Sequence, residues 1–319
     1  MKNTSNRAVS APDRTQELNT ELASKIARHI GSSEKLATPI PRFTLHRRTA
    51  PTAACPATYK PSVIVIPQGR KQVQIGGQTL TYDSSRYLLT SVDLPTVARV
   101  VEASEQQPCL ALNLRLDISI VREFLSQENF RMLAVASDYP AMSTGPVTAD
   151  FLSAWCRLLD LLSNPADIPF LSGLIEREIV YRILRGPEGA RLRAIATLGD
   201  QSHRTAKAIA WIKANYAKPL RVEELAQVAG MAISTFHHHF RTLTAMSPLQ
   251  YQKQIRLQAA RARMLAGDVD AATVAFEVGY ESASQFNREY SRLFGQPPIR
   301  DARALRSPGA PALELVATA

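Results

Sequence analysis

The chain has 319 residues and a formal net charge of +10, and apolar residues make up 45% of it. This length predicts about two domains of ordinary size, each with a packed core. No apolar run approaches the ~20 residues of a membrane span, and residues 1–11 lack the apolar stretch of a secretory signal. The three cysteines are an odd and sparse set, which indicates a reduced cytoplasmic protein without a disulfide framework.

Residues 1–35 predict an N-terminal arm followed by a helix. Residues 1–12 are polar and include Ser, Asn and Pro, a composition that favours disorder. Residues 13–30 carry an apolar side chain at every fourth position, which is typical of an amphipathic helix. The positions are Leu18, Leu22, Ile26 and Ile30.

Residues 36–116 consist of short apolar runs separated by turn signals. Many short strands at such spacing predict an antiparallel sandwich or barrel. The runs span residues 62–66, 71–75, 79–82, 87–90, 96–101 and 109–116.

From Ser119 onward the apolar pattern becomes helical. Its periodicity predicts helices over residues 147–164 and 169–185 that form an antiparallel pair. The pair could pack on the barrel, form a dimer interface, or do both. We assign residues 36–190 to one domain and residues 191–204 to a linker.

The third part of the chain is basic. Residues 201–306 contain 15 Lys and Arg against 8 Asp and Glu, so most of the excess positive charge lies there. A basic domain beside a nearly neutral one suggests an anionic polymer as partner, with nucleic acid the first candidate. The charge alone would fit a soluble basic surface equally well.

Two helix-turn-helix units repeat about 50 residues apart in this basic part. The first covers residues 222–240 and the second covers residues 274–290. Each unit has a small Ala where two helices approach, a Gly where the chain leaves the first helix, and two aromatic residues at i, i+4 on the second helix. This tandem arrangement predicts two recognition helices that enter DNA major grooves.

Residues 248–266 predict a long helix that connects the two units, with Pro near its start and Gly267 just past its end. We expect its buried stripe at Ile255, Ala259, Ala262 and Leu265. Its other faces would carry Lys253, Arg256, Arg261 and Arg263. Ser282 is a suitable N-cap for the second recognition helix, with Gln285 three residues later as its capping-box partner.

Residues 205–303 resemble the AraC/XylS family of bacterial transcription regulators. The motifs that carry this resemblance are SPLQY at 247–251, RLQAAR at 256–261, VAFEVGYES at 274–282, QFNREY at 285–290 and FGQPP at 294–298. The stretches at 59–62, 68–71 and 87–95 resemble the regulatory domain of a subgroup of that family.

The resemblance implies an α+β fold in two parts. A cupin-like antiparallel β-barrel with flanking helices would occupy residues 36–190 and sense a small molecule. An all-α domain of two tandem helix-turn-helix units joined by a long helix would occupy residues 205–306. Residues 307–319 would form a disordered tail.

The resemblance also implies which side chains face the DNA. In the first recognition helix they would be Ser234, His237 and His238, with Arg241 nearer a phosphate. In the second they would be Ser284, Gln285 and Arg288, and we expect Lys253 and Arg256 to contact phosphates. The chemistry agrees, because Arg can bind guanine and Gln can bind adenine, each in a bidentate manner.

One residue departs from the family pattern. The usual Ser cap of the first recognition helix is Ala232 here, a poor cap that would cost about 1 kcal/mol. Ser234 could instead cap a helix that starts two residues later.

Other functions fit the sequence less well. Three successive His residues at 237–239 point about 100° apart on a helix, so they cannot converge on one metal ion. A cupin enzyme needs several His and a carboxylate around a metal, but residues 1–190 contain only His29 and His46. An alkyl-transfer repair protein would need four zinc-bound cysteines, and the chain has three. We therefore expect no enzyme activity, no cofactor and no metal.

An effector pocket could be lined by strand residues, although each of them is also a natural core residue. The candidates are Tyr59, Val63, Val65, Tyr82, Tyr87 and Leu89. Alternatively, Cys109 or Cys55 could react with an electrophile that acts as the signal, whereas Cys156 fits ordinary burial.

The sequence thus predicts a cytoplasmic, nucleoid-associated bacterial regulator, most simply an activator that also contacts RNA polymerase. It would bind double-stranded DNA as a homodimer and respond to a small-molecule effector. No membrane partner is expected.

Overall fold

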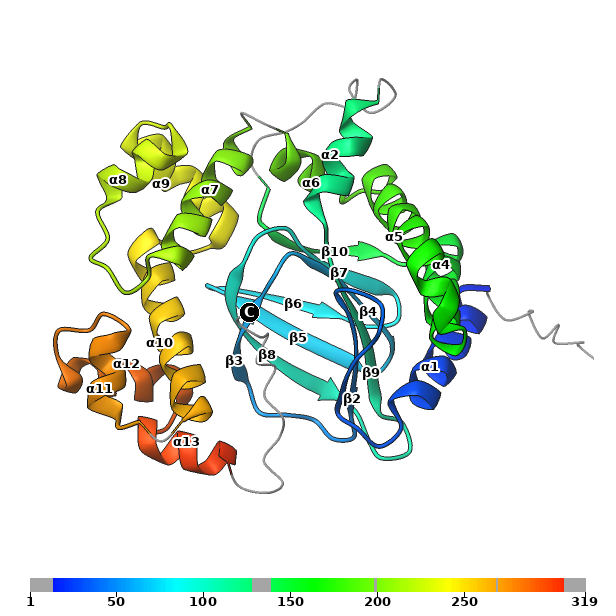
Figure 1. Cartoon of the computed structure of the whole chain (residues 1–319), viewed down its shortest axis with the longest axis horizontal. Helices are drawn as coiled ribbons and strands as arrows, with labels where there is room; N and C mark the ends of the chain where they lie inside the picture. Colours follow the sequence, from blue (N-terminus) through cyan, green and yellow to red (C-terminus); the bar gives the residue numbers. More distant parts are fainter. Residues whose placement is uncertain (1–13, 128–138, 198–199, 268, 307–319) are drawn as a thin grey trace, which may run out of the picture.

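The computed structural model of the chain describes residues 14–127, 139–197, 200–267 and 269–306. The predicted disordered arm at 1–12 and the predicted tail at 307–319 lie outside the described residues. Figure 1 shows three groups of elements side by side: a helical layer, two β-sheets and a second group of helices.

The two sheets are antiparallel throughout. The larger sheet has the order β1 (Lys35–Ala37), β2 (Phe43–Arg48), β9 (Cys109–Arg115), β4 (Ser62–Gln68), β7 (Arg86–Thr90) and β10 (Met142–Pro146). The smaller sheet has the order β3 (Cys55–Tyr59), β8 (Leu94–Glu102), β5 (Arg70–Ile75) and β6 (Gln78–Tyr82). All six predicted strands are present and the α+β fold is confirmed, but the two sheets face each other without closing into one barrel.

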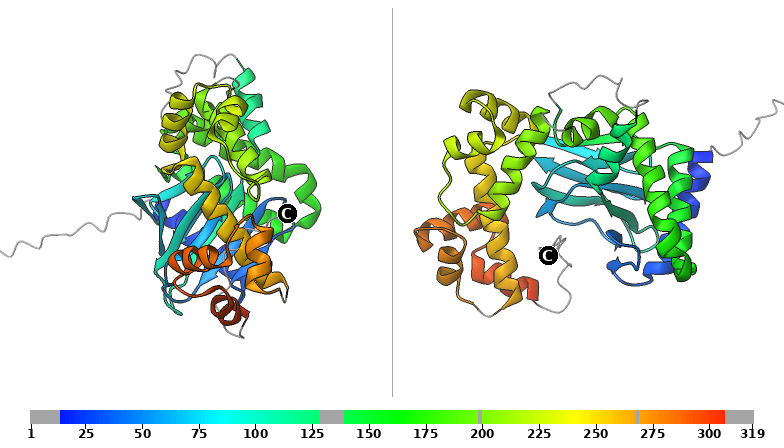
Figure 2. Two further views of the ribbon diagram at one scale, coloured as in Figure 1. Left: turned by 90° about the vertical axis from the view of Figure 1, so that its left-hand side faces the viewer. Right: turned by 45° about the horizontal axis from the view of Figure 1, so that its top comes forward.

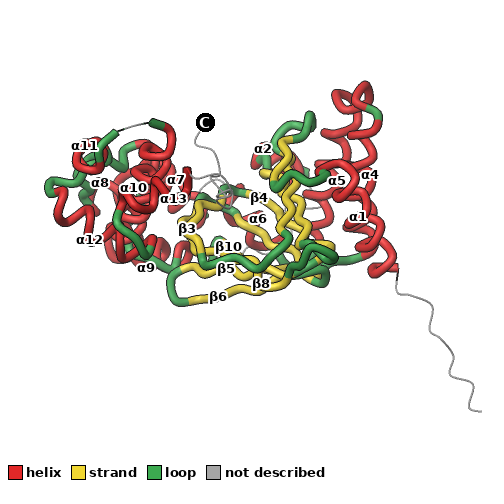
Figure 3. Tube along the Cα trace, turned by 90° about the horizontal axis from the view of Figure 1, so that it is seen from below, coloured by secondary structure: helices red, strands yellow, loops and turns green. Residues whose placement is uncertain are grey.

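Three helices cover the outer face of the larger sheet, as Figure 3 shows from below. They are α1 (Arg14–Ile30), α4 (Ala149–Asp160) and α5 (Ile168–Arg185), and short 3₁₀ turns at Leu161–Ser163 and Pro165–Asp167 join the last two. Trp155 of α4 is fully buried in the core beneath them, beside Phe43 of β2. The predicted helix at 13–30 and the predicted antiparallel pair are therefore confirmed.

The segment expected to be a linker is largely helical. Helix α6 (Gly189–Ala196) buries Leu192 and Ile195, and α7 (Gln201–Ala214) begins before residue 205. Helix α6 packs against α2 (Ile118–Ser126) and α5. The two halves of the chain are thus joined by packed structure, because apolar side chains of α6 enter both adjoining cores.

The remaining helices form two units on either side of one long helix (Figures 1 and 2). The first unit contains α7, α8 (Val222–Ala229) and α9 (Ile233–Thr244). The second contains α11 (Ala271–Glu277), α12 (Ala283–Phe294) and α13 (Pro298–Arg306), and α10 (Pro248–Ala266) joins the units. Helix α8 ends at Gly230 with φ +62°, the left-handed conformation predicted for this turn.

The buried face of α10 differs from the predicted stripe. Its buried apolar residues are Tyr251, Ile255, Leu257, Ala260 and Met264, and Arg261 is also buried. Both helix-turn-helix units and strands β3 and β8 pack on this helix, so it is covered on more than one side. A single apolar stripe that repeats every 3.6 residues therefore does not describe the buried surface of this helix.

Candidate DNA interface and effector cavity

The first recognition helix is α9. Phe236 and Phe240 are fully buried, with ring centroids 5.4 Å apart, and Tyr251 of α10 packs edge-on against Phe240. This packing fixes which face of α9 points outward. The predicted DNA-facing residues Ser234, His237, His238 and Arg241 are all exposed on it.

Helix α9 begins without a side-chain cap. Ala232 occupies the N-cap position with extended backbone angles, and no side chain accepts a hydrogen bond from the first turn. The helix starts at Ile233, so Ser234 lies inside the first turn and does not cap a later start.

Replacing Ala232 with Ser should therefore stabilise the first unit. The Ser hydroxyl would accept a backbone N–H of the first turn, which stabilises by about 1 kcal/mol. We expect Ala232→Ser to raise the free energy of unfolding by that amount in urea denaturation. The matched control is Ser282→Ala, which removes the cap of α12 and should lower it; equal stability of Ala232→Ser and the parent chain would contradict the assignment.

The second recognition helix is α12. Phe286 and Tyr290 repeat the buried aromatic pair, with ring centroids 5.4 Å apart. Ser282 caps the helix by accepting the Gln285 backbone N–H at 3.4 Å, as predicted. The Gln285 side chain donates to Glu289 instead of returning to the cap, so only half of the predicted capping box forms. Ser284, Gln285 and Arg288 are exposed.

The two predicted phosphate contacts on α10 have different surroundings. Lys253 lies 3.0 Å from Glu289 of α12, and its side chain is 50% exposed. Arg256 donates from Nε to the Tyr216 carbonyl at 2.6 Å and from Nη2 to the Lys218 carbonyl at 2.9 Å. Its guanidinium therefore fastens α10 to the turn after α7, which argues against a role in binding phosphate.

A salt titration should separate these two residues. Lys253→Ala should weaken binding to all DNA sequences and lower the slope of log K against log salt by about 0.9. Arg256→Ala should leave that slope unchanged and lower the free energy of unfolding instead, because the Tyr216, Ala217 and Lys218 carbonyls each lose a hydrogen bond. Gln252 still donates to the Tyr216 and Lys218 carbonyls in that variant. A lowered slope for Arg256→Ala at unchanged stability would restore the phosphate role.

A buried ion pair ties α10 to the second unit. Arg261 donates to both carboxylate oxygens of Asp301 at 2.7 and 2.9 Å, and Tyr290 of α12 donates to the same carboxylate at 2.8 Å. Burial and the neighbouring carboxylate raise the pKa of Tyr290. The helical period alone predicts Arg261 on an outer face, because no spacing rule links it to a residue forty positions away.

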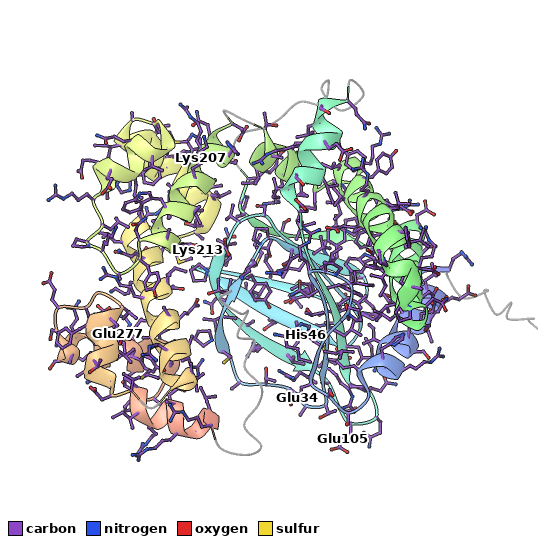
Figure 4. All side chains as sticks on the ribbon, in the orientation of Figure 1. Glu34, His46, Glu105, Lys207, Lys213 and Glu277 are labelled. Atoms are coloured by element: carbon purple, nitrogen blue, oxygen red, sulfur yellow. The ribbon has the colours of Figure 1, made fainter. Side chains whose placement is uncertain are left out.

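The sheets contact both helical units directly. Asp93, in the turn before β8, pairs with Lys213 of α7 at 2.7 Å and accepts the Tyr251 hydroxyl on its carbonyl at 2.7 Å. Figure 4 shows Lys213 on the side of α7 nearest the sheets. Gln258 of α10 donates to the Ala57 carbonyl of β3 at 3.1 Å. A Cβ atom at Gly76 would lie only 2.6 Å from the carbonyl oxygen of Ala245, which ends α9.

Two cavities lie on the inner faces of the sheets. The larger, of about 370 Å³, lies against β1, β2, β4 and β9, and the smaller, of about 140 Å³, lies against β3, β5 and β8. His46 lines both cavities, and Figure 4 shows it between the sheets. Cys55 and Cys109 line the smaller one, and Cys55 accepts a hydrogen bond from Arg261 at 3.7 Å.

The structure divides the predicted effector residues into two groups. Tyr59 lines the larger cavity, and its hydroxyl lies 3.5 Å from that of Tyr82. The other four point to the opposite face and pack beneath α1 and α4; they are Val63, Val65, Tyr87 and Leu89. They line neither cavity, so the expectation that they hold the effector is corrected. Side chains alternate along a strand, so these four belong to the helix-covered face.

The third cysteine, Cys156, is buried against α1, and burial raises the pKa of its thiol to about 11. All three cysteines are free thiols. Within the described ranges, no group of His, Cys, Asp and Glu side chains is arranged to hold a metal ion. No described helix combines the length and apolar character that a bilayer span requires.

Two family models match the chain and together cover most of it. Residues 39–191 match the N-terminus of AraC-type transcriptional regulators, and residues 225–304 match a helix-turn-helix domain. The chain belongs to the AraC family. Members of this family bind DNA through the helix-turn-helix domain, and the relatives matched here are transcription regulators, not enzymes.

Individual relatives of this AraC-family chain agree with that assignment. The thermoregulatory protein LcrF of Yersinia pestis is 23% identical over 241 residues, which covers 73% of this chain and 86% of LcrF. The transcriptional activator RhaS of the same species is 29% identical over 105 residues, 33% of this chain and 38% of RhaS. The crystal structure of ToxT from Vibrio cholerae shares the fold, with a TM-score of 0.55 at 10% identity over 83% of this chain and 98% of ToxT.

Proposed function

We propose that this AraC-family regulator activates transcription when a small molecule binds between its two sheets. The observation that carries the proposal is the larger cavity, because it lies on the inner face of the larger sheet, opposite a smaller sheet that contacts α7, α10 and α12. A ToxT structure of the same fold carries an unsaturated fatty acid, which supports a small molecule as the ligand. RhaS, which matches 33% of this chain, is named as a transcriptional activator, and this supports activation.

The effector would act by favouring one arrangement of the helical units over another. A ligand shifts such an equilibrium only through its different affinity for the two arrangements. The contacts that would report its binding are Asp93 with Lys213 and Tyr251, and β3 with α10. In the DNA-bound form, α9 and α12 would enter successive major grooves and present the exposed residues described above, and RNA polymerase would be the further partner of an activator.

A genome-wide footprint of the full-length protein on fragmented genomic DNA tests this function. We expect enrichment at a few promoters, with the occupancy changed by a metabolite of a neighbouring operon. Uniform, salt-sensitive binding without peaks, with and without added metabolites, would contradict sequence-specific regulation.

We also propose that the chain forms a homodimer through α5. Phe170 and Leu174 are 77% and 62% exposed, and Leu171 and Tyr181 extend the same apolar surface. Charges beside it are balanced within one copy, since Arg177 pairs with Glu123 and Arg182 pairs with Glu178. A second copy of this face would therefore meet an apolar, electrically neutral surface, as an isologous interface requires.

Charge introduced on α5 should dissociate this dimer. We expect Phe170→Glu and Leu174→Glu to shift the molecular mass from dimer to monomer in light scattering coupled to size-exclusion chromatography. Leu249→Glu, at a position 57% exposed on α10, is the matched control and should leave the mass unchanged. A parent chain that is monomeric at micromolar concentration would refute the interface.

The alternative is that the regulator responds to covalent modification of a cysteine. Cys55 and Cys109 line the same small cavity, so one electrophile could reach either thiol there, and Cys55 also contacts Arg261 of α10. Replacing both cysteines with Ser should then abolish induction. Full induction of a reporter by the double variant would eliminate covalent sensing and leave the ligand-gated function standing.

A further inference from the structure

The charged side chains that line the larger cavity are all basic. Cationic side chains line it from two strands and two connecting segments, and none of its described lining residues is Asp or Glu. They are Lys35, Arg42, Lys60 and Arg115, and His46 lines the same cavity. Arg42 is balanced by Asp117 at 2.7 Å and Glu176 at 2.9 Å, so its charge is used within the protein.

Lys60 and Arg115 are brought together where two neighbouring strands meet. Ser62 at the start of β4 is in register with Arg115 at the end of β9, and Lys60 lies in the turn that leads into β4. Arg115 shares the inner face of β9 with Asn113, because side chains two apart point the same way. Burial, Arg115 and Lys213 all lower the pKa of Lys60, which shows the positive field at this end of the cavity.

The rest of the cavity would suit an organic body. Ile64 supplies an apolar wall on the inner face, and Tyr59 adds an aromatic ring. The side-chain oxygen of Asn113 is buried and accepts no hydrogen bond from the described residues. A volume of about 370 Å³ falls within the usual range for small-molecule sites.

We infer that the effector is a small organic anion, with its carboxylate beside Lys60 and Arg115 and its apolar body toward Ile64 and Tyr59. This inference rests on the proposed role of the cavity as the effector site. A carboxylate accepts charge-assisted hydrogen bonds from both cations, and an uncharged analogue of the same shape would leave the cations facing each other.

The position also links the anion to the DNA-binding part. Asp93 is the acidic group that faces Lys60, and it holds Lys213 of α7 at 2.7 Å. An anion beside Lys60 and Arg115 reduces the positive field that opposes Lys213. The same anion also repels Asp93, so binding changes the strength of the contact between the sheets and α7. Lys213→Gln should therefore weaken the effect of the ligand on DNA occupancy without abolishing ligand binding.

Calorimetric titration of the full-length protein with aliphatic and aromatic monocarboxylates, each beside its primary amide, tests the inference. We expect at least one acid to bind while its amide does not. Arg115→Gln and Lys60→Gln should each lower the binding affinity for that acid about tenfold or more. Arg115→Lys should restore part of the affinity. Arg70→Gln is the matched control, because Arg70 is paired with Asp83 at 3.3 Å outside the cavity lining.

Equal binding of acid and amide, undiminished binding by both Gln variants, or no binding by any acid would each overturn the anionic effector. The same protein preparations are footprinted on genomic DNA to separate this failure from failure of the proposed function. Promoter peaks that persist without any response to acids would reject the anion and retain the regulator. Absence of peaks under every condition would reject the regulator itself.

Discussion

Arg261→Ala should destabilise the second helix-turn-helix unit by about 3–5 kcal/mol, because the substitution leaves the carboxylate of Asp301 buried without its partner. Both side chains are only 8% exposed, and Tyr290 of the recognition helix donates to the same carboxylate. We expect hydrogen exchange in α12 and α13 to accelerate strongly, while exchange in the sheets changes little. Specific DNA binding should fall with it, since α12 loses its support.

The control for this prediction is an ion pair on the same helix. Arg263 pairs with Glu277 at 3.1 Å, but its side chain is 47% exposed, so Arg263→Ala should cost less than about 1 kcal/mol. The double variant Arg261→Met with Asp301→Leu should recover much of the lost stability, because no buried charge is then left alone. Similar losses of stability for Arg261→Ala and Arg263→Ala would contradict the prediction that the buried pair contributes more than the exposed one.

Arg288→Ala should weaken binding to the cognate DNA site by about 1–3 kcal/mol and relax the base preference at one position. Arg288 is exposed on α12, and a guanidinium there could bind guanine through two hydrogen bonds. Binding to random DNA should change much less. Affinities for cognate, single-base-substituted and random duplexes at fixed salt check this expectation.

Arg300→Ala removes the same charge from the exposed surface of α13, outside both recognition helices, and should have a small effect on every duplex. If Arg288→Ala weakens cognate and random DNA equally, Arg288 contacts a phosphate and does not read a base. The side chain would then contribute affinity but no sequence preference.

The helical units could be predicted from the sequence because their determinants are local. Gly230 ends α8, Phe236 and Phe240 lie one turn apart on α9, and Ser282 caps α12. Each signal involves residues within a few positions of one another. The pair of Arg261 and Asp301 is the counterexample, since only the tertiary fold brings α10 and α13 together.

The sheets were less predictable for two physical reasons. Strands β3 and β10 contain Pro56 and Gly145, and β1 is only three residues long, so these strands lack the usual apolar run. Strand β4 has the opposite problem, because residues 62–67 are all buried. Without a polar face there is no alternation to show which side points inward, so the sequence does not reveal that Val63 and Val65 pack beneath the helices and not in an effector pocket.

The contact between Gly76 and Ala245 bears on how this protein can be dissected. Buried side chains of the sheets and of α7 to α10 belong to one continuous core, and even a methyl group at position 76 would collide with the end of α9. Cutting the chain near residue 200 would bare apolar surface on both fragments. Phenotypes of such truncations would then report misfolding. A bulky residue at position 76 would instead weaken the contact between the sheets and the DNA-binding part while the polypeptide stays intact.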